Sequence, residues 1–262
     1  MVVEISERKG RNVGKLTGKV AVVTGASKGI GASIAEHLAA EGASVVVNYA
    51  HSKDGAGDVV KRITSKGGKA ITSQADVSKP AEITKLIGDT KRSYGKLDIL
   101  VNNAGVYEFA PVDAVTPEHF HKMFDLNVLG LLLTTKAALP LIPDTGGSII
   151  NISSVAGPMP VSGASVYSAT KAAVDAVTVA LSQELGPKHI RVNSVNPGMV
   201  ETEGVHAAGI MESDFRKQVE AQTPLGRIAQ PDDIATATVF FASEDAGWVT
   251  GQTLLVAGGY RH

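Results

Sequence analysis

The sequence predicts an α/β fold in which one parallel β-sheet is covered by helices on both faces. Two observations lead to this prediction. Seven short runs rich in β-branched residues alternate with longer stretches of helical periodicity, which is the pattern of strands joined by crossover helices. Runs such as AVVTG and ILVNNAG are also apolar at successive positions, as strands buried on both faces are.

Each element carries its own signal, taken in order along the chain. The first run, VAVV, leads through a glycine-rich turn into the helical pattern IGASIAEHLAAE, and the second run, VVVN, ends in a polar tip. The expected strands cover residues 20–23, 45–48, 70–76, 97–102, 148–153, 190–195 and 253–256. The expected helices cover residues 30–41, 54–66, 80–94, 117–142, 167–185, 212–222 and 231–243.

We predict a single domain. No linker-like shift in composition and no internal repeat divides the chain, so the domain is expected to run from residue 16 to residue 262. The charged residues 1–15 are expected to form a flexible N-terminal extension.

The composition is that of an ordinary globular protein. Of the 262 residues 44% are hydrophobic and 19% are charged, and the formal net charge is −1, so we expect neither nucleic acid nor a membrane as a partner. The absence of cysteine excludes disulfides, thiolate nucleophiles and cysteine-ligated metals, and no metal site is expected. Because charges interrupt the apolar runs of the first sixteen residues and no stretch approaches about 18 apolar residues, we expect a soluble, cytoplasmic protein.

A glycine-rich turn, TGASKGIG, separates the first strand from the first helix. Gly25 permits the tight turn, while Gly29 and Gly31 let a pyrophosphate approach the backbone and the positive end of the helix. A ligand crevice is expected at this place in an alternating α/β chain, at the carboxyl ends of the strands. The alternative is a glycine-rich turn that binds no ligand.

The tip of the second strand indicates which dinucleotide would bind. An acidic residue about twenty positions after such a turn bonds the ribose of NAD, but this chain has the neutral Asn48 there. Asn48 and Ser52 offer hydrogen-bond donors, Tyr49 would pack beside the ribose, and Lys28 reaches a 2′-phosphate as a point charge. We therefore predict NADP(H). In the alternative interpretation these residues contact no ligand, and Asp54 takes the place of the missing acidic residue.

Tyr167 and Lys171 stand four residues apart near the start of the helical pattern at 167–185. This spacing places both side chains on one helix face, about 6 Å apart. Tyrosine ordinarily titrates near pH 10, and a neighbouring ammonium together with a cationic nicotinamide ring would lower its pKa enough for acid–base work. The alternative is a tyrosine at a helix start beside an exposed lysine.

Six motifs occur in the order that is seen in the short-chain dehydrogenase/reductase family, which the chain resembles from residue 16 to residue 259. They are TGASKGIG, NNAG at 102–105, Asn127 in a long apolar helix, NISS at 151–154, YSATK at 167–171 and PGMVET at 197–202. The resemblance implies a doubly wound, Rossmann-type fold with a seven-stranded parallel sheet. It also implies a nicotinamide-dependent interconversion of a carbonyl and an alcohol.

The resemblance also implies a role for each matching residue. Tyr167 resembles the general acid/base, Lys171 would hold the nicotinamide ribose, and Asn127 would anchor a water that links Lys171 to solvent. The family's carbonyl-polarising serine lies thirteen positions before the tyrosine, which selects Ser154 over Ser153. The residues expected to contact the cofactor are Gly25, Ser27, Lys28, Gly29, Ile30, Gly31, Asn48, Tyr49, Ala50, Ser52, Asp76, Val77, Asn103, Ala104, Gly105, Tyr167, Lys171, Pro197, Gly198, Val200 and Thr202.

The expected function is NADP(H)-dependent reduction of a ketone or aldehyde, or the reverse oxidation. Two other enzyme functions stay open, a 3-oxoacyl-carrier-protein reductase and a sugar dehydrogenase. The non-enzyme alternatives are a cofactor-sensing binding protein and a scaffold with a vestigial pocket. The candidate substrate-contacting residues are mostly apolar, which favours a small ketone or aldehyde: Tyr107, Phe109, Met159, Val161, Met199, Val205, Ile210, Met211 and Phe215.

A homo-tetramer, or failing that a dimer, is expected from the helix at 167–185. Its only charged residues are Lys171, Asp175 and Glu184. A helix that is apolar nearly all round must be buried on two sides, and the sheet covers only one.

Overall fold

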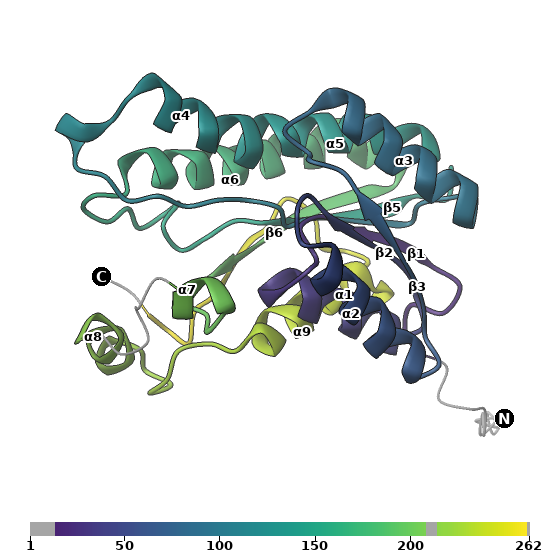
Figure 1. The fold of residues 1–262 in the computed structure, drawn as a ribbon. Coiled ribbons are helices and arrows are strands. Elements are labelled where there is room, and N and C mark those ends of the chain that lie inside the picture. Colours follow the sequence, from purple (N-terminus) through teal and green to yellow (C-terminus); the bar gives the residue numbers. More distant parts are fainter. Residues whose placement is uncertain (1–13, 208–213, 261–262) are drawn as a thin grey trace, which may run out of the picture.

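The protein forms a single seven-stranded parallel sheet with helices on both faces (Figure 1). The computed structural model describes residues 14–207 and 214–260. The strand order is β3-β2-β1-β4-β5-β6-β7, so the chain reverses its direction of winding between β1 and β4. This confirms the predicted doubly wound α/β architecture. A ligand crevice is expected at such a switch point, beyond the carboxyl ends of the strands.

The strands lie where the sequence predicts them, with ends that differ by up to two residues. Their bounds are β1 Val20–Val23, β2 Ser44–Tyr49, β3 Lys69–Gln74, β4 Ile99–Asn102, β5 Gly147–Ile152, β6 Ile190–Pro197 and β7 Thr253–Val256. The helices are α1 Gly29–Ala40, α2 Lys53–Ser65, α3 Pro80–Tyr94, α4 Pro117–Phe124, α5 Leu131–Ala138, α6 Ser165–Leu185, α7 Glu203–Ala207, α8 Asp214–Gln222 and α9 Pro231–Ala242. The sequence did not predict the short helix α7.

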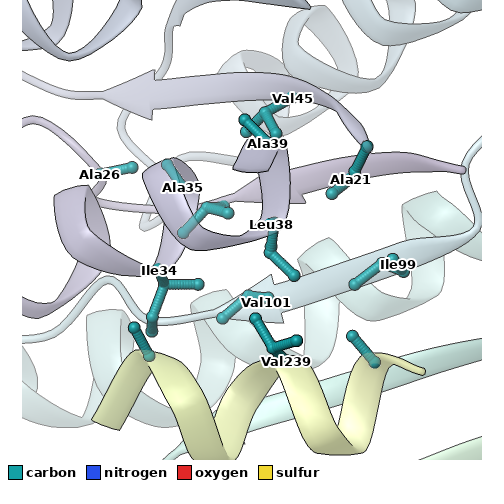
Figure 2. Packing of buried hydrophobic residues seen from close by; sticks show 14 of the residues in the cluster. Ala21, Ala26, Ile34, Ala35, Leu38, Ala39, Val45, Ile99, Val101 and Val239 are labelled. Atoms are coloured by element: carbon teal, nitrogen blue, oxygen red, sulfur yellow. The ribbon is translucent and has the colours of Figure 1, made fainter. Parts of the chain in front are cut away.

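Successive strand residues point to opposite faces of the sheet and build two cores. Helices α1, α2 and α9 cover one face, and α3, α5 and α6 cover the other (Figure 1). On the first face Ile34 and Leu38 of α1 belong to one core cluster with Val101 of β4 and Val239 of α9 (Figure 2). Because both faces are buried, the strands read as continuous apolar runs rather than as alternating ones.

The helix predicted at 117–142 is interrupted in the structure. A π-helical stretch, Asp125–Gly130, separates α4 from α5, and a short 3₁₀ turn, Leu139–Leu141, follows α5. The widened turn contains Asn127, and π-helical turns are frequent at functional sites. Periodicity alone did not predict this interruption, because a π-helical turn inserts only one extra residue into the helix.

The helical run Pro117–Leu141 is long and apolar enough, by length and composition, to cross a membrane. In the fold, however, α4 packs against α6, and α5 packs against α3 and β4. The run also contains the charged residues Lys122, Asp125 and Lys136. We therefore interpret it as a helix of the domain. The predicted cytoplasmic location stays a prediction.

The described chain begins in contact with the domain. The Leu16 amide donates to the Glu41 carbonyl at 2.8 Å, and the Leu16 side chain is buried in the core. The Lys15 backbone amide donates to the Glu41 carboxylate at 2.9 Å. The last residues of the extension predicted at 1–15 thus contact the domain. Residues 1–13 lie outside the described residues, and the flexible extension stays a prediction.

Candidate active site

A cavity of about 390 Å³ lies at the carboxyl ends of the strands and extends from the glycine turn to α6. It brings together many of the residues predicted for cofactor binding and catalysis: Gly25, Lys28, Gly29, Ile30, Gly31, Asn103, Gly105, Ser154, Tyr167, Lys171, Pro197, Gly198, Val200 and Thr202. Val106, Ile152 and Glu203 also line it, and the sequence reasoning missed them. A hollow of about 560 Å³ at the opposite ends of the strands, beside Arg191, contains none of these residues.

The glycine turn fits a bound anion. Gly29 has a φ of 55°, a backbone conformation that residues other than glycine rarely adopt. A Cβ at Gly31 would lie 2.6 Å from the Gly25 carbonyl oxygen and 2.5 Å from Nδ2 of Asn103. No acidic side chain occupies the first turn of α1, whose positive N-terminus faces the cavity, but the Glu203 carboxylate at the start of α7 would lie 3.5 Å from a Cβ at Gly29.

Asn103 holds the glycine turn against the end of β4. Its Nδ2 donates to the carbonyl oxygens of Thr24 and Gly25 at 2.8 and 3.1 Å. The Thr24 hydroxyl in turn accepts the backbone amides of Asn103 and Ala104 at 2.9 and 3.0 Å. The side chain of Asn103 is thus a structural clamp. Asn103 and Gly105 line the cavity beyond the end of β4.

Ser154, Tyr167 and Lys171 converge at the other end of the cavity. The Ser154 hydroxyl lies close enough to the Tyr167 hydroxyl to lower its pKa. Nζ of Lys171 lies 5.8 Å from the centre of the Tyr167 ring, as the i, i+4 spacing predicts. Lys171 also donates to the Ile152 carbonyl at 2.9 Å, at the end of β5. Ser153 also lines the cavity, but its hydroxyl is used within the protein, where it donates to the Lys171 carbonyl at 3.1 Å.

Burial controls the ionisation of both groups. Burial raises the pKa of Tyr167, and the nearby Ser154 hydroxyl lowers it by less. The sequence-based expectation of a lowered pKa is therefore wrong for the protein groups alone, since spacing predicts proximity but not desolvation. Burial also lowers the pKa of Lys171 to about 8, against the attraction of Asp175.

Asn127 supports the loop under the cavity. Its Oδ1 accepts the Val106 amide at 2.9 Å, and its Nδ2 donates to the Val106 carbonyl at 2.9 Å and to the Thr170 hydroxyl at 3.1 Å. A Cβ at Gly105 would lie 3.1 Å from Oδ1 of Asn127 and 3.7 Å from Nζ of Lys171. The side chain of Asn127 is therefore engaged with its protein neighbours. Its expected role in anchoring a water stays a prediction.

The structure corrects the role predicted for Asn48. The side chain is 1% exposed, and its Nδ2 donates to the carbonyls of Ser73 and Ala75 at 3.2 and 3.0 Å. Its Oδ1 accepts the Gly25 amide at 3.1 Å. Both amide hydrogens are used within the protein, so the side chain is not available to donate to a 2′-phosphate. Asn48 instead ties β2 to the glycine turn.

The neighbouring residues divide into buried and accessible ones. Tyr49 is also corrected, because its ring is 5% exposed and packs in the core under α2 rather than beside a ribose. Ser52, by contrast, is exposed at the N-cap of α2. A Cβ at Gly55 would lie 2.7 Å from both the Ser27 carbonyl oxygen and the Ser52 hydroxyl. The first turn of α2 therefore lies against the glycine turn, and exposed Lys28 projects from the latter.

The residues at the end of β3 make local contacts. Oδ1 of Asp76 accepts the Ser78 amide and hydroxyl at 3.0 and 2.7 Å. Burial alone would raise the pKa of Asp76, but these bonds and the Lys79 ammonium together lower it. Val77 is 4% exposed, and a Cβ at Gly130 would lie 2.6 Å from the Val77 carbonyl oxygen. Their predicted position beside an adenine, like that of Ala50, stays a prediction.

Aromatic and apolar side chains line the mouth of the cavity beside Tyr167. The Tyr107 ring lies edge-on to Phe109 and to Tyr167, with ring centres 6.0 and 6.2 Å apart. Met199 and Val205 line the same cavity, whereas Met159 and Val161 do not. Ile210, Met211 and the side chain of Phe215 lie outside the described residues.

Comparisons with known proteins agree with this geometry. Residues 25–261 match the family model described as "Enoyl-(Acyl carrier protein) reductase". An uncharacterised oxidoreductase of Methylorubrum extorquens is 56% identical over 247 residues, which cover 94% of this chain and 99% of that protein. The chain belongs to the short-chain dehydrogenase/reductase family.

Two further members of the short-chain dehydrogenase/reductase family carry more specific descriptions. A probable tetrahydroxynaphthalene reductase of Zymoseptoria tritici is 38% identical, covering 93% of this chain and 95% of that protein. The crystal structure of the angucycline C-6 ketoreductase LanV with bound NADP is 38% identical, with a TM-score of 0.89, and covers 94% of this chain and 97% of that one. The family and the fold expected from the motifs are thereby confirmed.

Proposed function

We propose that the protein reduces a ketone to an alcohol with NADPH, through Ser154, Tyr167 and Lys171. The observation that carries this proposal is the cavity that these residues share with the glycine turn. Bound NADPH would supply a hydride to the carbonyl carbon. The hydroxyls of Ser154 and Tyr167 lie close together in the same cavity, so both can reach one carbonyl oxygen. Because the raised pKa keeps the Tyr167 phenol protonated, that phenol can donate the proton to the alkoxide.

NADP(H) is the cofactor that the turn and the relatives favour. LanV, which shares this fold, binds NADP. In this chain the groups that would face a 2′-phosphate are Lys28 and the Ser52 hydroxyl, whereas the first turn of α2 also carries the carboxylate of Asp54, which opposes an anion. Lys171 would hold the nicotinamide ribose, since it lies beside Gly105 and Ile152. Thr202, whose methyl group lies near Gly29, would contact the carboxamide.

The substrate that best fits the mouth of the cavity is a ketone on a planar, fused-ring molecule. Tyr107 and Phe109 offer aromatic surfaces beside Tyr167, and such rings favour offset or edge-on contact with other rings. Met199 and Val205 add apolar surface. The names of the tetrahydroxynaphthalene and angucycline reductases among the relatives point to the same class of substrate. An acyl thioester or a sugar would leave these aromatic surfaces unused.

Initial rates on three probes test this substrate class. With NADPH, kcat/KM for β-tetralone is expected to exceed that for acetoacetyl-coenzyme A, and glucose with NADP⁺ is expected to give the lowest rate. Tyr107→Leu should lower kcat/KM for β-tetralone about tenfold, because an aromatic contact in the pocket is lost. The same variant should leave acetoacetyl-coenzyme A nearly unaffected. Preference for the thioester or for glucose would instead support one of the two alternative enzyme functions.

We also propose a homo-tetramer, because two separate faces expose apolar side chains. Helix α6 is already covered in part by α4 and by the π-helical stretch. From the sequence, the side of this helix that faces away from the sheet was expected to be covered wholly by another subunit. Phe120, Leu129 and Val179 nevertheless remain 41–45% exposed on this face. On the second face the edge strand β7 exposes Leu254 and Leu255, and Trp248 is fully exposed. An uncovered apolar edge strand invites association, and two such faces suit a tetramer.

Static light scattering at working concentration measures the assembly. A mass four times that of the 27.1 kDa chain is expected. A dimer would leave one of the two faces uncovered, and a monomer would contradict the proposal for both.

A further inference from the structure

Asp175 follows Lys171 by one turn of α6 and faces strand β6 instead of the cavity. Its Oδ1 accepts the Ser194 hydroxyl at 3.2 Å and Nδ2 of Asn196 at 3.1 Å, and its Oδ2 accepts the same Nδ2 at 2.8 Å. Ser194 and Asn196 are fully buried and stand two residues apart, so they point to the same face of the sheet. The single hydroxyl hydrogen of Ser194 is shared with Oδ1 of Asn196, which lies closer, at 2.7 Å, so Asn196 is the main donor that holds this carboxylate.

This network reaches the residues around the reacting group by two routes. Asn196 also donates to the Ser154 carbonyl at 3.3 Å, so the carboxylate that holds Asn196 helps to fix the backbone of Ser154. The Ser153 hydroxyl donates to the Lys171 carbonyl at 3.1 Å and lies near enough to Asp175 to lower the pKa of that carboxyl. The fit is close, because a Cβ at Gly157 would lie 3.0 Å from Oδ2 of Asp175. The loop that carries Ser154 is therefore packed directly on this carboxylate.

We infer that Asp175 is a positioning residue, which holds Ser154 through Asn196 and keeps the buried Lys171 in its charged form. The inference rests on the proposed roles of Ser154 and Lys171. Nothing in the motifs pointed to Asp175, although its i+4 spacing from Lys171 was visible in the sequence.

The charges around Asp175 are consistent with this role. Within the described residues, Lys171 is the charged group that acts on the pKa of Asp175, and Asp175 is the charged group that acts on the pKa of Lys171. Tyr167 is the other ionisable group on this face of α6, while β6 and the loop after β5 present the uncharged Ser194, Asn196 and Ser153. Burial lowers the pKa of Lys171 to about 8, and the Asp175 carboxylate opposes this.

The pH dependence of stability reports on the pair without cofactor or substrate. Burial lowers the pKa of Lys171 to about 8 in the folded protein, whereas in the unfolded chain the lysine keeps its ordinary pKa of 10.5. The unfolded state therefore binds more protons in this window, and this group makes the free energy of unfolding rise with pH there. Asp175→Asn should start this rise about one pH unit lower, because an opposite charge at short range is removed.

The experiment compares wild type, Asp175→Asn and the matched control Glu184→Gln, which removes an exposed carboxylate from the same helix. Denaturant unfolding is measured from pH 6 to pH 11, and kcat/KM for NADPH is measured with β-tetralone over the same range. In Asp175→Asn the fall of kcat/KM on the basic side should also move about one unit lower. An unshifted unfolding profile in Asp175→Asn, or an equal shift in Glu184→Gln, overturns the inference whether or not β-tetralone is a substrate.

If Asp175→Asn does not fold, the variant Asn196→Ala tests the positioning role instead. This variant keeps the carboxylate but breaks the link to Ser154, so kcat should fall about tenfold, as expected for a misplaced reacting group, with little change in KM for NADPH. Wild-type kcat in a folded Asn196→Ala variant contradicts the positioning role. If neither probe ketone nor thioester is turned over by wild type, the proposed function fails, and the unfolding profiles still decide the inference.

Discussion

Tyr167→Phe is expected to lower kcat by at least about 10²-fold, while the fold and the affinity for NADPH stay close to those of wild type. The ring stays in place, so its packing beside Tyr107 is kept and only the hydroxyl is lost. That hydroxyl is the proton donor in the proposed reaction, and general acid–base groups typically contribute 10²- to 10⁴-fold. The measurements are steady-state kinetics with β-tetralone, NADPH binding by fluorescence, and thermal unfolding.

Tyr94→Phe is the matched control for this substitution. Tyr94 ends α3, on the same face of the sheet as α6 but near the start of β4, at the opposite ends of the strands from the cavity, and burial raises its pKa as it does for Tyr167. Tyr94→Phe should leave kcat unchanged. If Tyr167→Phe retained near-wild-type turnover, the catalytic assignment would be wrong. If wild type bound NADPH but reduced none of the probe carbonyls, a cofactor-sensing binding protein would become the better interpretation.

The sequence predicted the architecture well, because parallel strands and their crossover helices leave local signals. The ranges predicted for β1 and β7 coincide with the observed Val20–Val23 and Thr253–Val256. The convergence of Tyr167 and Lys171 was equally accessible, since helical spacing fixes which residues share a face. The assignment of Ser154 depended on resemblance, and the structure adds that Ser153 is turned toward the Lys171 carbonyl.

The failures have a common physical cause, which is that tertiary contacts are not written in local patterns. The pKa of Tyr167 depends on how much protein surrounds it, and spacing contains no information on that. The π-helical turn around Asn127 shifts the register of a helix by one residue, below the resolution of a periodicity argument. In both cases the local sequence predicts which residues are neighbours along the helix, but not which parts of the protein surround them.

The wrong role predicted for Asn48 could have been avoided from the sequence pattern itself. Side chains two apart on a strand share a face, and Val46 belongs to the core on the α3 side of the sheet. Asn48 therefore had to point inward with Val46, and a buried amide needs partners within the protein. Its partners are the carbonyls of Ser73 and Ala75 and the amide of Gly25. The residue closes the end of β2 rather than reading the cofactor.

Asn48→Asp is accordingly expected to lower the free energy of unfolding by about 3 kcal/mol, within a range of roughly 2–5. The new carboxylate would face two carbonyl oxygens that now accept hydrogen bonds at 3.2 and 3.0 Å, so two donors are lost and a negative charge is buried without a partner. Only the bond from the Gly25 amide would remain. Protonation would relieve the repulsion, so the loss should shrink as the pH falls. Denaturant unfolding at pH 7 and pH 5 measures both effects.

Lys28→Ala separates cofactor preference from stability in the same experiment. Lys28 is exposed on the glycine turn, so its removal should leave the free energy of unfolding unchanged. Loss of a charged contact to the 2′-phosphate should lower the ratio of kcat/KM for NADPH to that for NADH about tenfold. Asn48→Asp should change stability first, and Lys28→Ala should change preference alone. If Asn48→Asp kept wild-type stability while eroding the preference for NADPH, its side chain would have to reach the 2′-phosphate after all, and the inward orientation of Asn48 would be refuted.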